Sequence, residues 1–349
     1  MFCNFHGSLV DDVIKMRLKP VLLLAATVAT RSYRGGAASS PRGGRGGYRG
    51  RGGAPPRSRR PPPVGDNFGD GMDFEGDDFV EDDLGEPFDA LYGVSPILSA
   101  LRTQRRTLKK LWFQDSLDVD KRNDRPALRE IETLAHAAGV PIGRLDKGTL
   151  NSMCRNRPHQ GIVLEASPLE FEPLQALPRI ERQGSNAPLW LALDEVSDPQ
   201  NLGALLRSAF FLGVDGVLVS AKNTCSLTPT VSKSSAGAME LSTVYAARNL
   251  PRTLEAARED GWQVVGAALE QSVAPSELDH DVPTVLVLGS EGHGLRTNVL
   301  RACTSLVRIP RGASAADEAE LVDSLNVSVA GGILLYSLVE PRRAKIADA

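Results

Sequence analysis

The 349-residue chain has few of the residues that cross-links, metal sites and membrane spans require. Its four cysteines include no Cys-x-x-Cys pair, so we expect reduced thiols rather than a disulfide scaffold. Its five histidines show no His-Glu-x-x-His or His-x-x-x-His spacing, which argues against a metal site. The longest apolar stretch near the start, residues 21–29, is far shorter than the ~20 residues of a membrane span. We therefore expect a soluble protein with no metal and no membrane segment.

Charge is distributed unevenly along the chain, although the net charge is only -3. Residues 31–65 contain nine arginines and no acid, whereas residues 66–89 contain eleven acids and no base. The rest of the chain is nearly neutral and long enough for about two domains. This contrast predicts a disordered tail over 35–87, attached to a globular body that begins at residue 88.

The first 34 residues resemble a targeting segment. Residues 16–34 are basic, contain no acid and include a short apolar run, which is typical of organellar transit peptides. A secretory signal is the alternative, but unpaired cysteines in the body argue against export. We expect a targeting segment over 1–34 and favour the mitochondrion over the chloroplast.

Residues 35–63 contain repeated Arg-Gly-Gly text and too little apolar surface to fold. Arginine stacks on bases and pairs with phosphates, so one interpretation is sequence-tolerant contact with RNA. The alternative is a solvated spacer. The acidic block over 66–89 could fold back on the arginines and mask them, or could be inert.

The body predicts two α/β units joined by a proline-bearing linker over 167–188. In the first unit, residues 88–166, we expect helices over 91–103 and 125–138, and strands over 107–113, 140–144 and 160–166. In the second unit, residues 189–341, we expect strands over 189–196, 216–220, 242–247, 262–269, 284–290 and 305–310. Helical patterns alternate with these strands over 200–212, 250–259, 294–302 and 325–339. Buried apolar strands alternating with helices predict a parallel sheet covered on both faces.

Ligands of such sheets bind beyond the carboxyl ends of the strands, which directs attention to the loops after residues 196, 290 and 310. In the first loop, Asp198 and Pro199 form a natural start for a helix that contains Asn201 and Arg207. An arginine inside the apolar text ALLRSAFFLG needs either a partner or a function. A structural ion pair is the simpler explanation for Arg207.

The second loop, LGSEGHGL, is a glycine-rich turn in which the backbone can approach a ligand. Glu291 would repel a phosphate there, which favours a ligand with amines or hydroxyls. In the third region, Ser324 or Asn326 can cap the last helix. Gly331 and Gly332 then permit close packing, and a second subunit is one candidate for their neighbour.

These three segments, DPQNLGALLRSAFFLG, LVLGSEGHGL and IPR…SLNVSVAGGILLY, resemble the ordered motifs of the SpoU (TrmH) branch of the SPOUT RNA methyltransferases. Residues 91–166 are similar to that family's L30e-like substrate-binding domain, from LYGVSPILSAL to HQGIVLEA. The likeness is strongest to the mitochondrial large-subunit rRNA guanosine-2′-O-methyltransferase group. The span 311–323 departs from the bacterial pattern, because it is longer and more acidic.

The resemblance implies a parallel-sheet α/β domain with a deep carboxy-terminal trefoil knot. It implies S-adenosyl-L-methionine as cofactor, held mainly by backbone groups of Gly289, Ile309 and Leu325. It also implies a homodimer with the pocket at the subunit interface, large-subunit rRNA as partner, and no metal.

The expected reaction transfers a methyl group to the 2′-oxygen of a guanosine ribose. The family pattern assigns proton removal to Arg207, which either acts as a base or stays charged and stabilises the developing alkoxide. Asn201 would orient Arg207 or the ribose, Glu291 and Asn326 would fix the pocket, and Ser324 would bond the ribose or the cofactor. A tRNA substrate, or an rRNA-binding assembly factor with dispensable catalysis, are the alternatives.

A basic cluster at the end of the first helix predicts phosphate contacts without sequence readout. A solvated helix face is the other explanation. The cluster comprises Arg102, Arg105, Arg106, Lys109 and Lys110.

Overall fold

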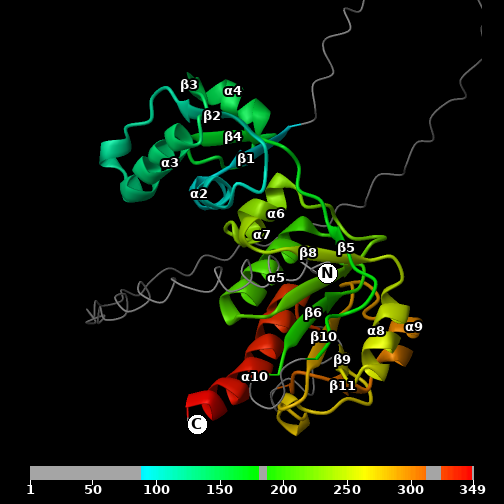
Figure 1. Cartoon of the computed structure of the whole chain (residues 1–349). Coiled ribbons are helices and arrows are strands. Elements are labelled where there is room, and N and C mark those ends of the chain that lie inside the picture. The colour runs from blue at the N-terminus through cyan, green and yellow to red at the C-terminus, as the bar shows by residue number, and fades with distance from the viewer. Residues whose placement is uncertain (1–87, 181–186, 312–323, 348–349) are drawn as a thin grey trace, which may run out of the picture. The chain divides into compact units, whose positions relative to one another are not determined.

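The computed structural model describes residues 88–180, 187–311 and 324–347 (Figure 1). The expected targeting segment, the arginine-rich block and nearly all of the acidic block lie outside these residues. All described residues belong to one compact unit of the chain.

The first α/β unit is built on a four-stranded sheet of order β1-β4-β2-β3. β4 pairs antiparallel with β1 and β2, and β2 pairs parallel with β3. Its strands are β1 (Asp89–Tyr92), β2 (Leu108–Gln114), β3 (Ile142–Leu145) and β4 (Ile162–Ala166). Its helices are α2 (Val94–Thr103), α3 (Arg125–Ala137) and α4 (Lys147–Met153), with a 3₁₀ turn over Val119–Lys121.

The expected helix over 91–103 was wrong at its start. Leu91 and Tyr92 belong to β1, where Leu91 pairs with Leu164 of β4. Gly93, at φ 92°, separates the strand from α2. The text LYGVSPILSAL alternates too little to reveal a strand of four residues, and pairing with a distant strand decides its structure.

The second unit is built on a seven-stranded sheet of order β11-β9-β10-β6-β7-β8-β5 in which every pair is parallel. This confirms the predicted parallel sheet. Its strands are β5 (Glu172–Pro173), β6 (Leu189–Leu193), β7 (Gly216–Ser220), β8 (Val244–Ala247), β9 (Gln263–Ala267), β10 (Thr284–Leu288) and β11 (Ser305–Val307). Its helices are α5 (Pro199–Leu212), α6 (Pro229–Ser234), α7 (Ala238–Leu241), α8 (Leu250–Glu259), α9 (Thr297–Ala302) and α10 (Val327–Ala347), with a 3₁₀ turn over Pro275–Glu277. The sequence did not predict α4, α6 or α7, which are only seven, six and four residues long.

Helices cover both faces of the larger sheet (Figure 1). Leu191 and Leu193 of β6 point into an apolar cluster with α5 and α10. Trp190 and Ala192 of the same strand point into a second cluster with α8 and α9. All five residues of β6 are buried, because alternate side chains enter opposite cores.

The helix α5 begins and ends as the sequence predicts. The Asp198 carboxylate accepts hydrogen bonds from the amides of Gln200 and Asn201, and Pro199 occupies the first turn. Gly213, at φ 77°, ends the helix in the left-handed conformation that glycine adopts without strain. These two caps fix where the first polar loop stops and the helix starts.

Gly331 packs inside its own chain rather than against a second subunit, which corrects the expectation for this residue. A Cβ at position 331 would collide with side-chain carbons of Leu205 and Leu288. At Gly332 the nearest atom to such a Cβ is Ser208 Oγ at 3.7 Å, an ordinary contact. Gly331 therefore lets α10 lie close to both α5 and β10.

The predicted knot concerns how the chain passes through its own loop, and strand order does not test it. Residues 312–323, between β11 and α10, lie outside the described part. The knot stays a prediction.

Candidate functional site

Adjacent parallel strands bring two of the motif loops together. β6 and β10 are neighbours in the sheet, with Leu193 opposite Leu288 at their carboxyl ends. The chain after β6 leads through Asp198 into α5, and the chain after β10 forms the glycine-rich loop. The loops therefore leave the sheet side by side, at the edge where ligands of parallel sheets bind.

Three predicted site residues form one hydrogen-bonded cluster at this edge. Asn201 Nδ2 donates to Glu291 Oε1 at 2.9 Å, and Asn326 Nδ2 donates to the same oxygen at 2.5 Å. Asn326 Nδ2 also lies 3.0 Å from Asn201 Oδ1. The cluster joins α5, the loop after β10 and the start of α10, which are 125 residues apart at most.

Two helix N-termini explain why a carboxylate belongs at the centre of this cluster. Asn201 lies in the first turn of α5, and Asn326 caps α10 by accepting hydrogen bonds from the amides of Ser328 and Val329. Helix N-termini carry partial positive charge and stabilise nearby anions. Glu291 meets both termini, so its charge is balanced within the protein instead of facing a ligand alone.

The loop after β10 is a tight turn that requires glycine. Ser290 and Gly294 exchange backbone hydrogen bonds of 3.1 and 2.9 Å, so the chain doubles back over Glu291. A Cβ on Gly289 would overlap the backbone of Gly294 and Leu295. Gly294 itself has φ 63°. The turn aims Glu291 at the asparagines, and no larger residue fits at position 289 without moving the loop.

A buried aspartate and an arginine, both missed by sequence reasoning, tie this turn to β6. Asp194 is fully buried and accepts bonds from the Arg296 backbone amide at 3.1 Å and from its Nε at 2.9 Å. Arg296 Nη1 also lies 3.0 Å from Glu195 Oε1. The hydrogen bond that the Arg296 guanidinium donates to Asp194 raises the pKa of Arg296 above its usual value. A signal was present in the sequence, because an aspartate directly after an apolar strand needs a partner.

A hollow of about 200 Å³ opens beside the cluster. Its lining comes from the loop after β6, Asn201, the turn after β10 and the start of α10. Gly289, Ile309 and Leu325, the predicted cofactor residues, are not among the lining residues. No backbone hydrogen bond joins any of these three to another described residue outside the regular sheet and helix ladders, so their peptide groups are available.

Arg207 and Ser324 are not joined to the cluster. Arg207 lies on α5, exposed, and neither a hydrogen bond nor an ion pair links it to the described part of the chain. The simpler explanation, a structural ion pair within the chain, is therefore wrong for these residues. Ser324 is exposed two positions before Asn326. The sequence spacing already indicates that Arg207 points away from Asn201, because six residues along a helix turn a side chain about 120° away.

The predicted phosphate-binding cluster is wrong for Arg106, whose side chain is completely buried. Arg105 is also engaged inside the protein, since its Nη1 donates to the Ser242 carbonyl at 2.6 Å. Arg102 and Lys109 keep more than half of their side chains exposed. Lys110 lies 3.9 Å from the centre of the Trp112 ring.

The described cysteines are free thiols. Burial raises the pKa of Cys154, Cys225 and Cys303 to about 11, so all three are protonated near neutral pH.

Among the described residues, no group of three or more His, Cys, Asp or Glu side chains could hold a metal ion. No helix in the same residues is both long and apolar enough to cross a membrane.

Family models and relatives agree with this architecture. Residues 188–336 match the SpoU rRNA Methylase family, and residues 90–172 match the domain described as RNA 2'-O ribose methyltransferase substrate binding. The chain belongs to the SpoU rRNA methylase family.

Two relatives give a narrower comparison. The chain is 39% identical over 265 residues to human "rRNA methyltransferase 1, mitochondrial", covering 72% of this chain and 73% of that protein. It is 36% identical over 255 residues to the Pseudomonas aeruginosa "23S rRNA (guanosine-2'-O-)-methyltransferase RlmB", covering 73% of this chain and 97% of the relative.

A solved structure agrees with the fold. The AdoMet-bound rRNA methyltransferase from Sinorhizobium meliloti superposes with a TM-score of 0.57 at 24% identity, covering 73% of this chain and 87% of that one.

The tie between Asp194 and Arg296 generates a stability prediction. Asp194→Asn should lower the free energy of unfolding by about 2 kcal/mol, because Arg296 loses its buried charged partner. Urea denaturation followed by circular dichroism measures this. Asp281→Asn is the matched control, since Asp281 pairs with Lys345 with both side chains about half exposed, and it should cost less than about 1 kcal/mol. Equal losses in the two variants would contradict a structural role for Asp194.

Proposed function

We propose that this protein is an S-adenosylmethionine-dependent RNA methyltransferase that modifies the 2′-hydroxyl of a guanosine in large-subunit rRNA. The observation that carries the proposal is the Asn201–Glu291–Asn326 cluster, which joins the three family motifs at one edge of a parallel sheet. The human and bacterial relatives are named as rRNA methyltransferases, and the bacterial name specifies methylation at the 2′-oxygen of guanosine.

The residues at the site fit the cofactor. Gly289 is buried while its peptide group has no bond in a turn or cap, and such a group needs a partner. Ile309 follows β11 and Leu325 precedes α10, and neither has a backbone hydrogen bond to another described residue outside the sheet and helix ladders. These three residues would hold S-adenosylmethionine, which supplies an electrophilic methyl group bound to a sulfonium. Glu291, held by two asparagines, fixes the adjacent turn.

Arg207 would act on the ribose. A hydroxyl is a weak nucleophile until its proton leaves, and a guanidinium is a poor base because it holds its proton strongly. We therefore favour a role in which Arg207 stays charged. It would bind a substrate phosphate and stabilise the developing alkoxide, without having to give up a proton first. In the alternative, the substrate phosphate helps Arg207 to accept the proton. Ser324 would bond the ribose or the cofactor.

A homodimer would bring Arg207 to the site. Arg207 shares an exposed face of α5 with Phe210 and Phe211, and Phe211 is 82% exposed. Arg343 Nη2 of α10 donates to the Leu212 carbonyl at 2.9 Å, so α5 and α10 lie side by side (Figure 1). α10 adds exposed apolar side chains at helical spacing, namely Val329, Ile333 and Tyr336. An apolar surface of this kind across two helices marks an interaction site, and a second copy covering it would place Arg207 at a shared pocket.

We place the protein in the mitochondrion. Three relatives, from human, Dictyostelium discoideum and Schizosaccharomyces pombe, carry that location in their names. The basic, acid-free segment over 16–34 supports the same compartment. The chloroplast is the alternative.

Methyl transfer in vitro tests the function. Purified protein should transfer labelled methyl groups to a large-subunit rRNA fragment, and Arg207→Ala should lower kcat by about 10²–10³-fold, as loss of one alkoxide-stabilising group does elsewhere. Cofactor affinity should stay unchanged. A fragment with 2′-deoxyguanosine at the target and a tRNA transcript are the controls. Transfer to tRNA alone would redirect the proposal, and no transfer by the wild type would favour an assembly factor.

Mapping of 2′-O-methyl groups tests the compartment and the base. Mitochondrial large-subunit rRNA from cells with the gene should carry a methylated guanosine that is lost when the gene is removed. Chloroplast rRNA, where present, is examined in the same cells. A loss confined to the chloroplast, or to another base, would overturn the corresponding part of the proposal.

The oligomer is tested by a charge on the exposed apolar face. Ile333→Glu should convert a dimer into a monomer, because a carboxylate cannot be buried there without a partner. Sedimentation equilibrium at micromolar protein measures the mass. Leu269→Glu is the matched control, since Leu269 is even more exposed than Ile333, at 54% against 40%, but lies outside α5 and α10. A wild-type protein that sediments as a monomer would contradict the dimer.

A further inference from the structure

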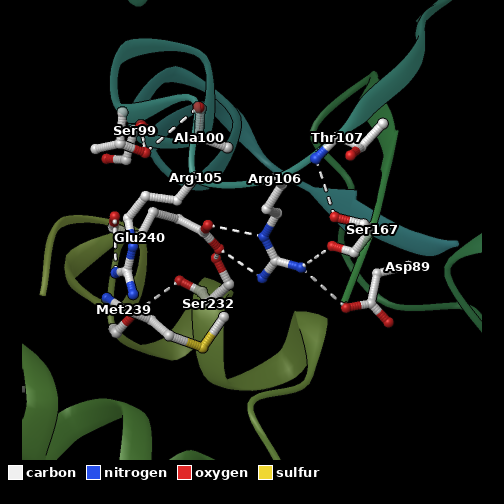
Figure 2. Close-up of polar contacts among 12 residues, drawn as sticks. Asp89, Ser99, Ala100, Arg105, Arg106, Thr107, Ser167, Ser232, Met239 and Glu240 are labelled. Atoms are coloured by element: carbon white, nitrogen blue, oxygen red, sulfur yellow. Dashed lines mark hydrogen bonds and ion pairs between the residues drawn. The ribbon is translucent and has the colours of Figure 1, made fainter. Parts of the chain in front are cut away.

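The most deeply buried ion pair in the described residues joins the two α/β units. Arg106 follows α2 in the first unit, and Glu240 belongs to α7 in the second; neither side chain is exposed. Arg106 Nε donates to Glu240 Oε2 at 2.8 Å, and Nη2 donates to Oε1 at 2.9 Å (Figure 2). Two parallel hydrogen bonds of this kind fix the plane of both groups as well as their separation.

Neighbouring groups satisfy the rest of the pair. Arg106 Nη1 donates to the Ser167 carbonyl at 2.6 Å and to Asp89 Oδ2 at 3.1 Å. Ser232 Oγ donates to Glu240 Oε1 at 2.8 Å (Figure 2). The guanidinium thus binds the first strand of its own unit, the start of the linker and a helix of the other unit at the same time.

Arg105 strengthens the same contact. Its Nη1 donates to the carbonyls of Ser242 and Glu240 at 2.6 and 3.4 Å, where a cation is favoured at the end of α7. The other polar contacts between the units are single bonds, from Tyr92 to Thr230 and from Lys233 to Gln160. Arg105 and Arg106 therefore constrain the relative position of the two units more tightly than these single bonds do.

Stability alone does not account for a buried ion pair. Removing two charges from water costs about as much as their attraction returns, and apolar residues of similar volume often stabilise a protein equally well. What an arginine–carboxylate fork adds is a single allowed geometry. At a boundary between two units, that geometry sets the orientation of one unit on the other.

We infer that Arg106 and Glu240 are positioning residues that hold the RNA-binding unit in one orientation on the methyltransferase unit. The inference rests on the proposed function, because orientation matters only if RNA bound by one unit must present a ribose to the other. Neither residue touches the cluster of Asn201, Glu291 and Asn326. Their loss should therefore change RNA kinetics and leave cofactor binding intact.

Two variants of the full chain test this. Arg106→Lys keeps the charge but removes the fork, and the double variant Arg106→Met/Glu240→Leu removes both charges while filling the space. Each should raise the KM for the rRNA fragment or lower kcat by about tenfold or more, since small misplacements of a substrate are costly. The Kd for S-adenosylmethionine, measured by calorimetry, should stay within about twofold, as expected for a distant site.

Arg129→Lys is the matched control. Arg129 pairs with Asp120 on the exposed surface of the same unit, and its change should leave all three constants at wild-type values. Wild-type kinetics in Arg106→Lys, or full activity in the double variant, would overturn the inference, because space-filling alone would then suffice.

Hydrogen exchange separates this inference from the proposed function. In both variants the amides of β1 and α7 should exchange faster than in the wild type, whether or not any RNA is methylated. If the variants exchange faster but the wild-type protein never transfers methyl groups, the proposed function is contradicted, while the role of the ion pair in holding the two units together is supported. Unchanged exchange with altered kinetics would sink the positioning role.

Discussion

The parallel pairing of β6 with β10 is the constraint on which the site depends. Because the two strands run in the same direction with Leu193 opposite Leu288, the chain must leave both at the same edge of the sheet. That edge receives the N-termini of α5 and α10, and Glu291 lies where their partial charges meet. Asp194 and Arg296 then tie the two loops together beneath it.

The predicted site residues differ in how far the protein itself satisfies their polar groups. Asn201, Glu291 and Asn326 satisfy one another, so they determine where the loops lie. In the described part of the chain, no bond of this kind reaches the Arg207 guanidinium, and no backbone hydrogen bond outside the sheet and helix ladders reaches Gly289, Ile309 or Leu325.

The contact made by Arg106 joins the two α/β units. Arginines near the end of α2 looked like a phosphate-binding surface in the sequence, yet two of them turn inward to α7. The sequence places the charge of Arg106 on a surface, but α7 covers it, and its guanidinium then joins the two units through Glu240. The exposed members of the cluster, Arg102 and Lys109, pair with Glu130 and Glu165 on the surface of the first unit.

The sequence by itself determined the parallel sheet, because strands buried on both faces read as apolar runs alternating with helices. It also determined the caps of α5, which depend on Asp198, Pro199 and Gly213 alone. Only tertiary structure decided which polar residues meet. Asp194 with Arg296, and Arg106 with Glu240, are 102 and 134 residues apart. Their pairing follows from strand order and from how the units pack, and neither is encoded in local spacing.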